Sequence, residues 1–208
     1  MSTDATINGV LFLGGGRAKR LNGVSKPHFT INGKTLLDYG LTCVNRTVGS
    51  VPCIAITAPD DRIPRGMQST LEDPPFGGPI AGLRAGLAAL QNLSTPASDD
   101  SLVAVFPADS PLAPLLIPQL TLASHQHDGA IVSWGNRLNY LIGVYRFNKL
   151  NSILPNPAHG YSAHSVLDQL NVAIVDDADH LSIDVDYSSD VSQVRRLLGI
   201  HNLLEERS

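Results

Sequence analysis

A short apolar segment that opens directly into a glycine-rich, cationic loop constrains the fold of this chain more than any other feature. Residues 7–13 are apolar apart from one Asn-Gly pair, and three consecutive glycines follow them. An apolar run of this length, bounded by turn residues, is typical of a parallel strand buried on both faces. We therefore expect residues 7–13 to form a strand inside a sheet.

Strand and helix patterns alternate along the rest of the chain. Candidate strands cover residues 53–57, 102–107, 130–134, 141–147 and 172–175, and candidate helices cover 37–48, 80–93, 163–170 and 189–198. This alternation predicts an α/β protein with a mostly parallel sheet. Strands 130–134 and 141–147 are joined across Gly135-Asn136, so the later strands need not all be parallel. We expect one domain over residues 1–208, with residues 94–101 as a surface loop.

Composition excludes several classes of protein. The 15 Lys and Arg residues are outnumbered by 19 Asp and Glu residues, so no global attraction to nucleic acid or to an anionic membrane is expected. No stretch approaches the roughly 20 apolar residues of a membrane span, and the first residues lack the pattern of a signal peptide. The two cysteines, Cys43 and Cys53, lie among apolar residues. We expect a cytoplasmic protein with both thiols in its core.

The glycine-rich loop at residues 13–27 has the composition of a triphosphate-binding loop. Its glycines allow backbone N–H groups to approach a phosphate, and four cations neutralise the charge. A dinucleotide fingerprint would need a glycine at Lys19, and a P-loop would need Gly-Lys-Ser/Thr at residues 23–25. Pro27 also disfavours a helical conformation at Lys26. The loop therefore belongs to neither of these two common classes.

Two later segments end in carboxylates. Residues 103–107 are an apolar strand followed closely by Asp109, and ligands of open parallel sheets bind beyond the carboxyl ends of the strands. Near the C-terminus, Asp184 and Asp186 would share one side of an extended segment, and Ser188 or Ser189 would cap the last helix. Carboxylate oxygens suit Mg²⁺. An isolated aspartate at a strand end is nevertheless more often a turn or helix cap.

A proline- and glycine-rich segment, residues 72–83, leads into the helix at 80–93. Pro79 suits the first turn of a helix, and the small residues Ala81 and Gly82 would let a base or ribose lie close to the backbone. On its own this segment is equally well explained as a loop that opens an amphipathic helix.

These segments, in this order, resemble the MobA-like NTP transferases, whose first motif runs Leu-Ala-Gly-Gly-x-x-x-Arg-Met-Gly-x-x-Lys. The matching residues are Leu13, Gly15, Gly16, Arg20, Gly23 and Lys26, with Gly14 in the alanine position. The resemblance also covers the family's Gly-Pro-Leu-Ala-Gly segment at residues 78–82, its Cys-Asp-Met-Pro motif around Asp109 and its closing acidic motif at residues 184–190. It implies an α/β, Rossmann-like three-layer fold.

The resemblance also implies a set of site residues. Lys26, Arg20 and Asp109 would be catalytic, and Asp109 would bind Mg²⁺ together with Asp186 or, as the alternative, Asp184. The implied nucleotide-binding residues are Leu13, Gly14, Gly15, Gly16, Arg20, Lys26, Asp73, Gly78, Pro79 and Asp109. Whether Glu72 or Asp73 contacts the nucleoside stays open.

The implied reaction is Mg²⁺-dependent transfer of GMP from GTP to the phosphate of molybdopterin, in the molybdenum cofactor, with release of pyrophosphate. Cytidylyl transfer, a different phosphorylated acceptor and a non-catalytic NTP-binding regulator remain alternatives. The family's acceptor-side Gln/His-Pro and arginine-rich stretch are replaced by Asn139-Tyr140 and by residues 160–164, where Arg137 and His164 would substitute. The partners expected are GTP and molybdopterin, with neither nucleic acid nor membrane; contact with a molybdoenzyme or chaperone stays open.

Two other constellations are set aside. Residues 160–164 resemble a hydrolase nucleophile elbow, but His164 occupies the position of its final glycine. His125 and His127 form a pair without a third metal ligand in register, which favours a solvated loop.

Overall fold

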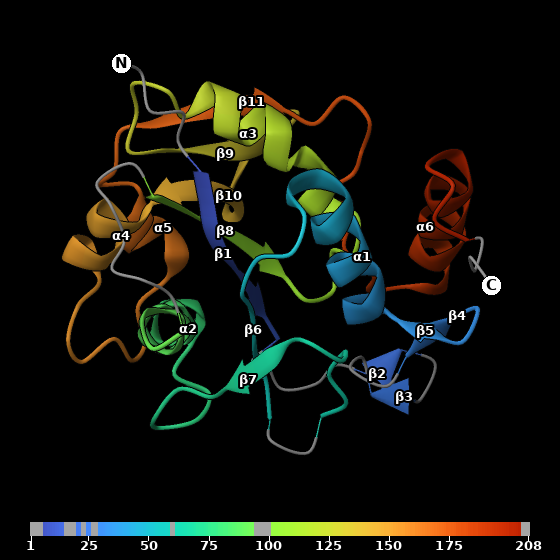
Figure 1. Ribbon diagram of the computed structural model, residues 1–208, viewed down its shortest axis with the longest axis horizontal. Coiled ribbons are helices and arrows are strands. Elements are labelled where there is room, and N and C mark those ends of the chain that lie inside the picture. Colours follow the sequence, from blue (N-terminus) through green and yellow to red (C-terminus); the bar gives the residue numbers. More distant parts are fainter. Residues whose placement is uncertain are drawn as a thin grey trace.

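The computed structural model describes residues 6–14, 20–21, 24–25, 29–58, 61–93 and 101–204, with only the backbone described at 20–21 and 24–25. A seven-stranded sheet with the order β11-β9-β10-β8-β1-β6-β7 forms its centre (Figure 1). The strands are β1 (Thr6–Leu13), β6 (Cys53–Ile56), β7 (Gln68–Thr70), β8 (Ser101–Pro107), β9 (Gly129–Trp134), β10 (Arg137–Arg146) and β11 (Val172–Asp176). Only β10 pairs antiparallel with its neighbours, so the expectation of a mostly parallel sheet is confirmed.

Helices cover both faces of the sheet and give the molecule three layers (Figure 1). One face carries α1 (Leu36–Val48), a 3₁₀ helix (Ala113–Leu116), α3 (Ile117–Ala123) and α6 (Ser188–Ile200). The other carries α2 (Pro79–Gln91), α4 (Phe147–Ile153) and α5 (Ala163–Leu167). Two short ribbons, β2 (Arg20–Leu21) with β3 (Val24–Ser25) and β4 (Thr30–Ile31) with β5 (Lys34–Thr35), lie outside the sheet.

The central strand β1 explains why its sequence is a continuous apolar run. Val10 and Phe12 point into the core beneath α1, and Leu11 points into the core against α2, with none of the three more than 1% exposed. Both faces of this strand are therefore buried, so its sequence lacks the alternation of polar and apolar residues that a half-exposed strand shows.

Local sequence sets the starts of the two long helices beside this strand. Thr35 Oγ1 accepts a hydrogen bond from the Asp38 N–H (3.1 Å), and the Asp38 carboxylate accepts one from the Thr35 N–H (2.8 Å), which makes a capping box for α1. Gly78 precedes α2 with φ 92°, a backbone conformation that favours glycine, and Pro79 occupies the first turn. The expected helix start near residue 80 is confirmed.

Several boundaries differ from the expectation. Phe147 begins α4 instead of ending a strand, and β10 extends back to Arg137 because Gly135, at φ 56°, turns the chain tightly. Helix α5 ends at Leu167, three residues before the expected end. The sequence did not predict β7, the 3₁₀ helix, α3 or α4, because segments of three to seven residues carry too little periodicity.

The C-terminal acidic segment, residues 183–190, also differs from the expectation. Residues 183–187 are not in a strand, so a shared strand side for Asp184 and Asp186 was wrong. Neither Ser188 nor Ser189 caps α6; the Asp190 carboxylate accepts the N–H groups of Asp186 (3.0 Å) and Tyr187 (2.7 Å). A carboxylate in the first turn satisfies these donors and also favours the helix dipole.

Both cysteines are buried free thiols, as expected. Burial raises the pKa of the Cys43 thiol to about 12 and that of Cys53 to about 11. Among the described residues, no helix is at once long enough and apolar enough to cross a membrane. Residues 94–100 of the expected surface loop lie outside the described ranges, and Ser101 already belongs to β8.

Candidate active site

The carboxyl ends of β1, β6 and β8 meet at one edge of the sheet. The Gly14 N–H donates to the Ile56 carbonyl (2.8 Å), and the Ala108 N–H donates to the Leu13 carbonyl (3.0 Å). The loops that follow these three strands therefore start side by side. In parallel α/β sheets such an edge is where ligands bind.

The first turn of α2 packs closely against this edge. A Cβ added to Gly82 would lie 3.4 Å from Ile56 Cγ2 and 3.5 Å from Leu13 Cδ2, and one added to Gly14 would lie 3.0 Å from the Ile56 carbonyl oxygen. Small residues therefore bring the backbone of β1 and of α2 together. Leu13, Gly14, Gly78 and Pro79, which the sequence proposed for nucleotide binding, all belong to this junction.

A backbone hydrogen bond joins the two acidic segments that the sequence proposed for metal binding. The Val185 N–H donates to the Asp109 carbonyl (3.0 Å), and Val185 is fully buried. Asp109 and Asp186 are half-buried, whereas Asp184 is exposed. The chain therefore brings Asp109 close to the segment that carries Asp186, across a long separation in sequence.

The donor chemistry of this pair fits Mg²⁺. Mg²⁺ in nucleotide-dependent enzymes is held by one or two carboxylates, with phosphate oxygens and water completing the coordination. Within the described ranges, no three His, Cys, Asp or Glu side chains gather into a protein-only metal site. Asp109 and Asp186 come from adjoining segments, and two such carboxylates match the nucleotide-dependent arrangement, in which phosphate oxygens and water complete the coordination.

Part of the expected site lies outside the described residues. Gly15, Gly16 and Lys26 fall in undescribed segments, and for Arg20 the structure gives only its backbone in β2, paired with Ser25 in β3. Their assignment to the phosphates stays a prediction.

The two acidic residues before α2 have opposite environments. Asp73 is exposed, whereas Glu72 is only 4% exposed, and its Oε2 atom has no hydrogen-bond partner within the described part of the chain. A buried carboxylate oxygen without a partner is costly. Phe76 in the same loop is exposed and has φ 64°, which is unusual for an aromatic residue.

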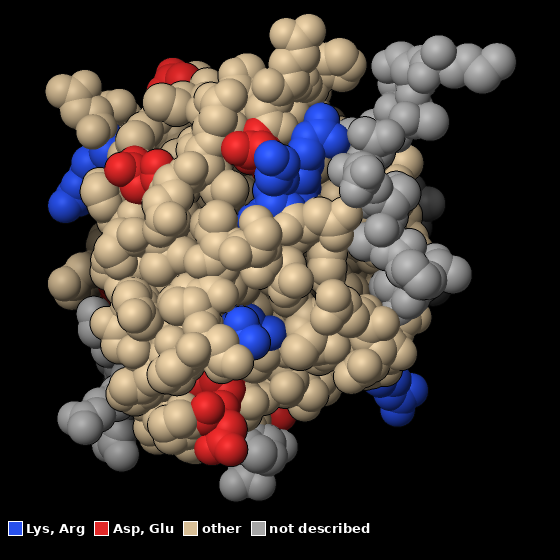
Figure 2. All heavy atoms as spheres, turned by 90° about the vertical axis from the view of Figure 1, so that its left-hand side faces the viewer, with Lys and Arg blue, Asp and Glu red and all other residues tan. Residues whose placement is uncertain are grey.

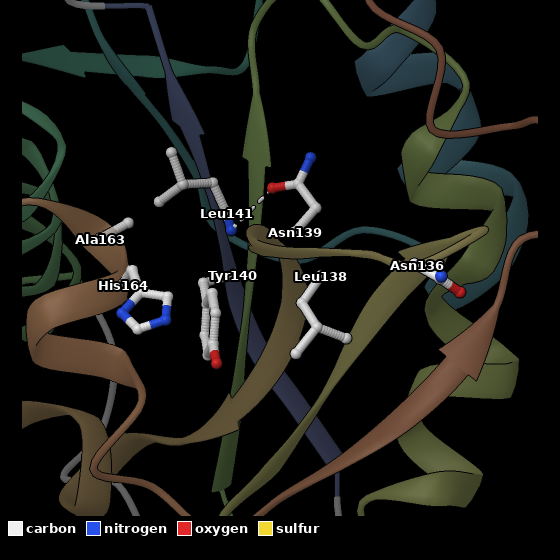
Figure 3. Close-up of a pocket in the computed structure, with 7 residues that line it drawn as sticks. All are labelled: Asn136, Leu138, Asn139, Tyr140, Leu141, Ala163 and His164. Carbon is white, nitrogen blue, oxygen red and sulfur yellow. Dashed lines mark hydrogen bonds between the residues drawn. The ribbon is translucent and has the colours of Figure 1, made fainter.

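The two segments that replace the family's acceptor-side motifs meet in one cavity (Figure 3). It has a volume of about 440 Å³ and is lined by Asn136, Leu138, Asn139, Tyr140, Leu141, Ala163 and His164. His164, predicted from the sequence, is in its wall, whereas Arg137 is exposed and does not line it. The sequence missed Asn136 and Leu138, because only the fold of the β9–β10 hairpin places them in the wall of this cavity.

Of the two constellations set aside, the first has a structural role, and the second gathers no metal site within the described part of the chain. Ser162 caps α5, with its Oγ accepting the Ser165 N–H (3.1 Å), which does not match a nucleophile on an elbow. His127 accepts a hydrogen bond from Arg146 Nε at its carbonyl oxygen (3.0 Å), beside the loop that precedes β9. The face on the α4 and α5 side shows charges in small, scattered groups among mostly uncharged residues (Figure 2). This view offers no broad basic surface in its described part.

The fold places the chain in a class of three-layer α/β proteins. In this class ligands bind at the edge where the carboxyl ends of parallel strands meet. The chain belongs to the MobA-like NTP transferase domain family, whose model matches residues 10–175. It is therefore a member of a nucleotidyltransferase family.

Similar proteins agree with this assignment. A molybdenum cofactor guanylyltransferase from Acidiphilium cryptum (strain JF-5) is 34% identical over 106 residues, which span 50% of this chain and 51% of the relative. The match thus spans about half the length of that relative. Among solved structures, molybdopterin-guanine dinucleotide biosynthesis protein A from Archaeoglobus fulgidus superposes with a TM-score of 0.63 at 17% identity, covering 92% of this chain and 99% of that one.

A second solved structure shares the fold but is named for a different activity. The 2-C-methyl-D-erythritol 4-phosphate cytidylyltransferase of Francisella tularensis superposes with a TM-score of 0.64 at 15% identity, covering 91% of this chain and 99% of that one. The fold is therefore common to proteins named for different nucleotides and acceptors.

Proposed function

We propose that this protein transfers GMP from GTP to the phosphate of molybdopterin, in the molybdenum cofactor, and releases pyrophosphate with the help of Mg²⁺. The hydrogen bond between the Val185 N–H and the Asp109 carbonyl carries the proposal, because it joins both acidic segments at the edge where the glycine-rich loop begins. The name of the Acidiphilium cryptum relative supports guanine and molybdopterin as the first choice.

The bond changes are those of an in-line displacement. An oxygen of the acceptor phosphate forms a bond to the α-phosphorus of GTP, and the bond from that phosphorus to the bridging oxygen of pyrophosphate breaks. The acceptor phosphate is already an anion near neutral pH, so no general base is required. Mg²⁺ would neutralise charge on the phosphates.

The chain's own residues would then position and neutralise the reactants. Asp109 and Asp186 would hold the metal, and Arg20 and Lys26 would oppose the negative charge that builds on the leaving pyrophosphate. Gly78, Pro79 and one of Glu72 and Asp73 would contact the nucleoside. Lys26→Ala should lower the transfer rate by about 100-fold or more without unfolding the protein. Lys149→Ala, which removes a surface partner of Asp128 (3.5 Å), is the matched control.

Pyrophosphate release tests the proposal. The purified chain is given GTP, CTP, ATP or UTP with Mg²⁺, with and without molybdopterin, and the released pyrophosphate is measured. We expect release only with GTP and acceptor together. Release from CTP instead would replace guanylyl by cytidylyl transfer, which the similarity to cytidylyltransferase folds also allows. Tight NTP binding without pyrophosphate release from any combination of NTP and acceptor would favour a non-catalytic, NTP-binding regulator.

A further inference from the structure

A second cavity lies against α1, which covers the opposite face of the sheet from α5 (Figure 1). It has a volume of about 310 Å³, and we call it the α1 cavity. Its walls come from the β4–β5 hairpin, from α1 between Asp38 and Asn45, and from residues 62–65 in the loop that follows β6. Three segments that are separate in the sequence therefore meet there.

The hairpin wall of the α1 cavity is held in place by buried contacts. Asn32 and Gly33 make its turn with φ 50° and 78°, and Ile31 pairs with Lys34 across it. The Tyr39 hydroxyl of α1 donates to the Ile31 carbonyl (3.0 Å), and both residues are at most 1% exposed. The backbone of Lys34 is therefore fixed against α1, which lowers the entropic cost of binding a ligand.

The loop wall is anchored as well. Pro64 is buried between Arg62 and Arg65, and the Met67 N–H donates to its carbonyl (3.2 Å). The Met67 side chain, 6% exposed, packs in the core beneath α1. The backbone of this loop is therefore held at Pro64 and Met67, while both arginine side chains stay exposed.

The charge of the α1 cavity is opposite to the net charge of −4 on the chain. Its cations are Lys34, Arg62 and Arg65, and Asp38 is its one acidic lining residue. The Asp38 carboxylate already accepts the Thr35 N–H (2.8 Å) and the Thr35 hydroxyl (2.7 Å). Within the described ranges, no side chain forms an ion pair or hydrogen bond with any of the three cations. Cations that the chain itself does not neutralise favour an anionic ligand.

The lining and the size of the α1 cavity suit a small phosphate-bearing anion. Guanidinium groups bind the oxygens of a phosphate in pairs, and an ammonium adds a point charge. Asn45 adds an amide, and Leu41 and Pro64 add a small apolar surface. The volume lies near the lower end of the range of about 300–1,000 Å³ for small-molecule sites.

We infer that the α1 cavity binds a small anion through its phosphate or pyrophosphate group, held by Arg62, Arg65 and Lys34. The anion is either inorganic or the phosphate end of a small organic molecule, because the same cations would hold both. The inference does not depend on the proposed transfer reaction. None of the lining residues belongs to the set proposed for the nucleotide, the metal or the acceptor.

Calorimetric titration of pyrophosphate into the full chain tests this inference. Mg²⁺ is left out because it would itself bind pyrophosphate, and the titration is repeated with GTP present so that the proposed nucleotide site is filled. We expect saturable binding in both cases. Arg62→Gln and Arg65→Gln should each weaken it about tenfold, because each removes charge-assisted hydrogen bonds.

A third variant tests the cavity from another wall. Asn45→Asp places a negative charge beside the anion and should weaken pyrophosphate binding about fivefold. Asn45, Arg62 and Arg65 are exposed, so none of these changes should lower the thermal unfolding temperature.

A matched pair of double variants separates a specific site from general attraction. Arg62→Gln with Arg65→Gln removes two positive charges from the cavity, whereas Arg195→Gln with Arg196→Gln removes two exposed charges from α6. Only the first pair should weaken binding. Absence of saturable binding, or equal weakening by both pairs, would mean an adventitious ion only and would overturn the inference.

GTP separates this site from the nucleotide site. If GTP displaces pyrophosphate and the Arg62 and Arg65 pair of changes also weakens GTP binding, the α1 cavity is part of the nucleotide site and the inference is wrong. Pyrophosphate binding that depends on these arginines would support the inference even if no NTP were turned over. Failure of the proposed function and failure of this inference are therefore distinguishable.

Two further probes identify the source of the phosphate group. Tighter binding of glycerol 3-phosphate than of inorganic phosphate would indicate an organic phosphate that packs on Leu41 and Pro64, and the reverse order would indicate an inorganic anion. Both results support the inference if Arg62→Gln weakens the binding. A hexaglutamate peptide that binds more tightly than pyrophosphate would overturn it in favour of an acidic protein segment.

Discussion

On the side of the sheet edge that we propose for the nucleotide, backbone meets backbone, whereas on the side that we propose for the acceptor a cavity is made of side chains. Gly14 and Gly82 lie where β1, β6 and the first turn of α2 meet, and a Cβ at Gly14 would lie only 3.0 Å from the Ile56 carbonyl oxygen. Across the edge, Tyr140 of a distorted hairpin packs against His164 of α5, and Asn136 lines the same cavity. Under the proposed function, phosphate and nucleoside would be met by main-chain groups and small residues, while the acceptor would be selected by side-chain shape.

The largest expected effect comes from the metal side of this comparison. Asp109→Asn keeps the backbone carbonyl that accepts the Val185 N–H but removes a charged oxygen ligand. We expect the transfer rate to fall by about 100- to 1,000-fold, as for loss of one electrostatic group at a phosphoryl centre. Steady-state pyrophosphate release measures this fall, and thermal unfolding should stay unchanged. Asp179→Asn, at an exposed position, serves as the control; equal activity in both variants would remove Asp109 from the site.

A glycine on the acceptor side should matter for stability instead. A Cβ at Gly143 would lie 2.5 Å from the Ala130 carbonyl oxygen, a backbone atom that cannot rotate away. Gly143→Ala should lower the free energy of unfolding by about 1–3 kcal/mol, measured by urea denaturation, and should leave GTP affinity intact.

The matched control for this change lies in α6. A Cβ at Gly199 would meet only Leu204 Cδ1 at an ordinary 3.6 Å, and alanine favours a helix. Gly199→Ala should therefore be neutral or stabilising. A loss of stability in Gly199→Ala equal to that in Gly143→Ala would show that the hairpin is not specially constrained.

A smaller effect is expected from the hydroxyl that fixes the cavity wall. The hydrogen bond to Asp168, aided by burial and by the Asp168 charge, raises the pKa of Tyr140 above its ordinary value. Tyr140→Phe should lower the free energy of unfolding by about 0.5–1.5 kcal/mol.

The pH dependence of this effect has a definite sign. Because the folded-state pKa is raised, the stabilisation is fully present below pH of about 10, the unfolded value, and is lost as the pH rises through the folded value. Denaturation midpoints of Tyr140→Phe and the unaltered chain should therefore converge on going from pH 8 to pH 11. A constant difference over that range would contradict the hydrogen bond as the source.

The smallest effect concerns strain on the nucleotide side. Phe76 has φ 64°, and for an aromatic residue the left-handed region costs about 1–2 kcal/mol. Phe76→Gly should recover up to about 1 kcal/mol in urea denaturation, after the entropic cost of glycine is included. Phe76→Ala keeps the unfavourable conformation and should not recover it. Equal stability of the two variants would mean that this loop is not strained.

The sequence predicted elements where periodicity was long or burial was complete. Strand β1 and helices α1 and α2 lie close to their expected ranges, because continuous burial and helical spacing leave clear patterns. Elements such as β7 and α3 were missed because they are short and partly exposed, and Phe147 was placed in a strand although it begins α4. Short elements take their conformation from the surfaces they pack against.

For the site residues, too, only positions next to recognisable elements could be placed from the sequence. Leu13, Gly14, Gly78 and Asp109 lie at the ends of recognisable elements, as the sequence placed them, and their roles in binding stay predictions. The strand-like alternation expected for Asp184 and Asp186 was wrong, because that segment lies outside the sheet, where Val185 contacts Asp109 and the Asp190 carboxylate accepts the Asp186 N–H. The contrast between buried Glu72 and exposed Asp73 was also beyond sequence patterns.

By itself, the sequence determined the α/β class and the order of the motifs, because burial pattern, glycine placement and capping act over a few residues. Only the tertiary structure decided which distant groups share the carboxyl edge of the sheet. The register shift in β10 and the packing of the β9–β10 hairpin against α5 create the cavity there, and one backbone hydrogen bond brings the two acidic segments together. Such contacts depend on how strands pair across the sheet, which local sequence does not encode.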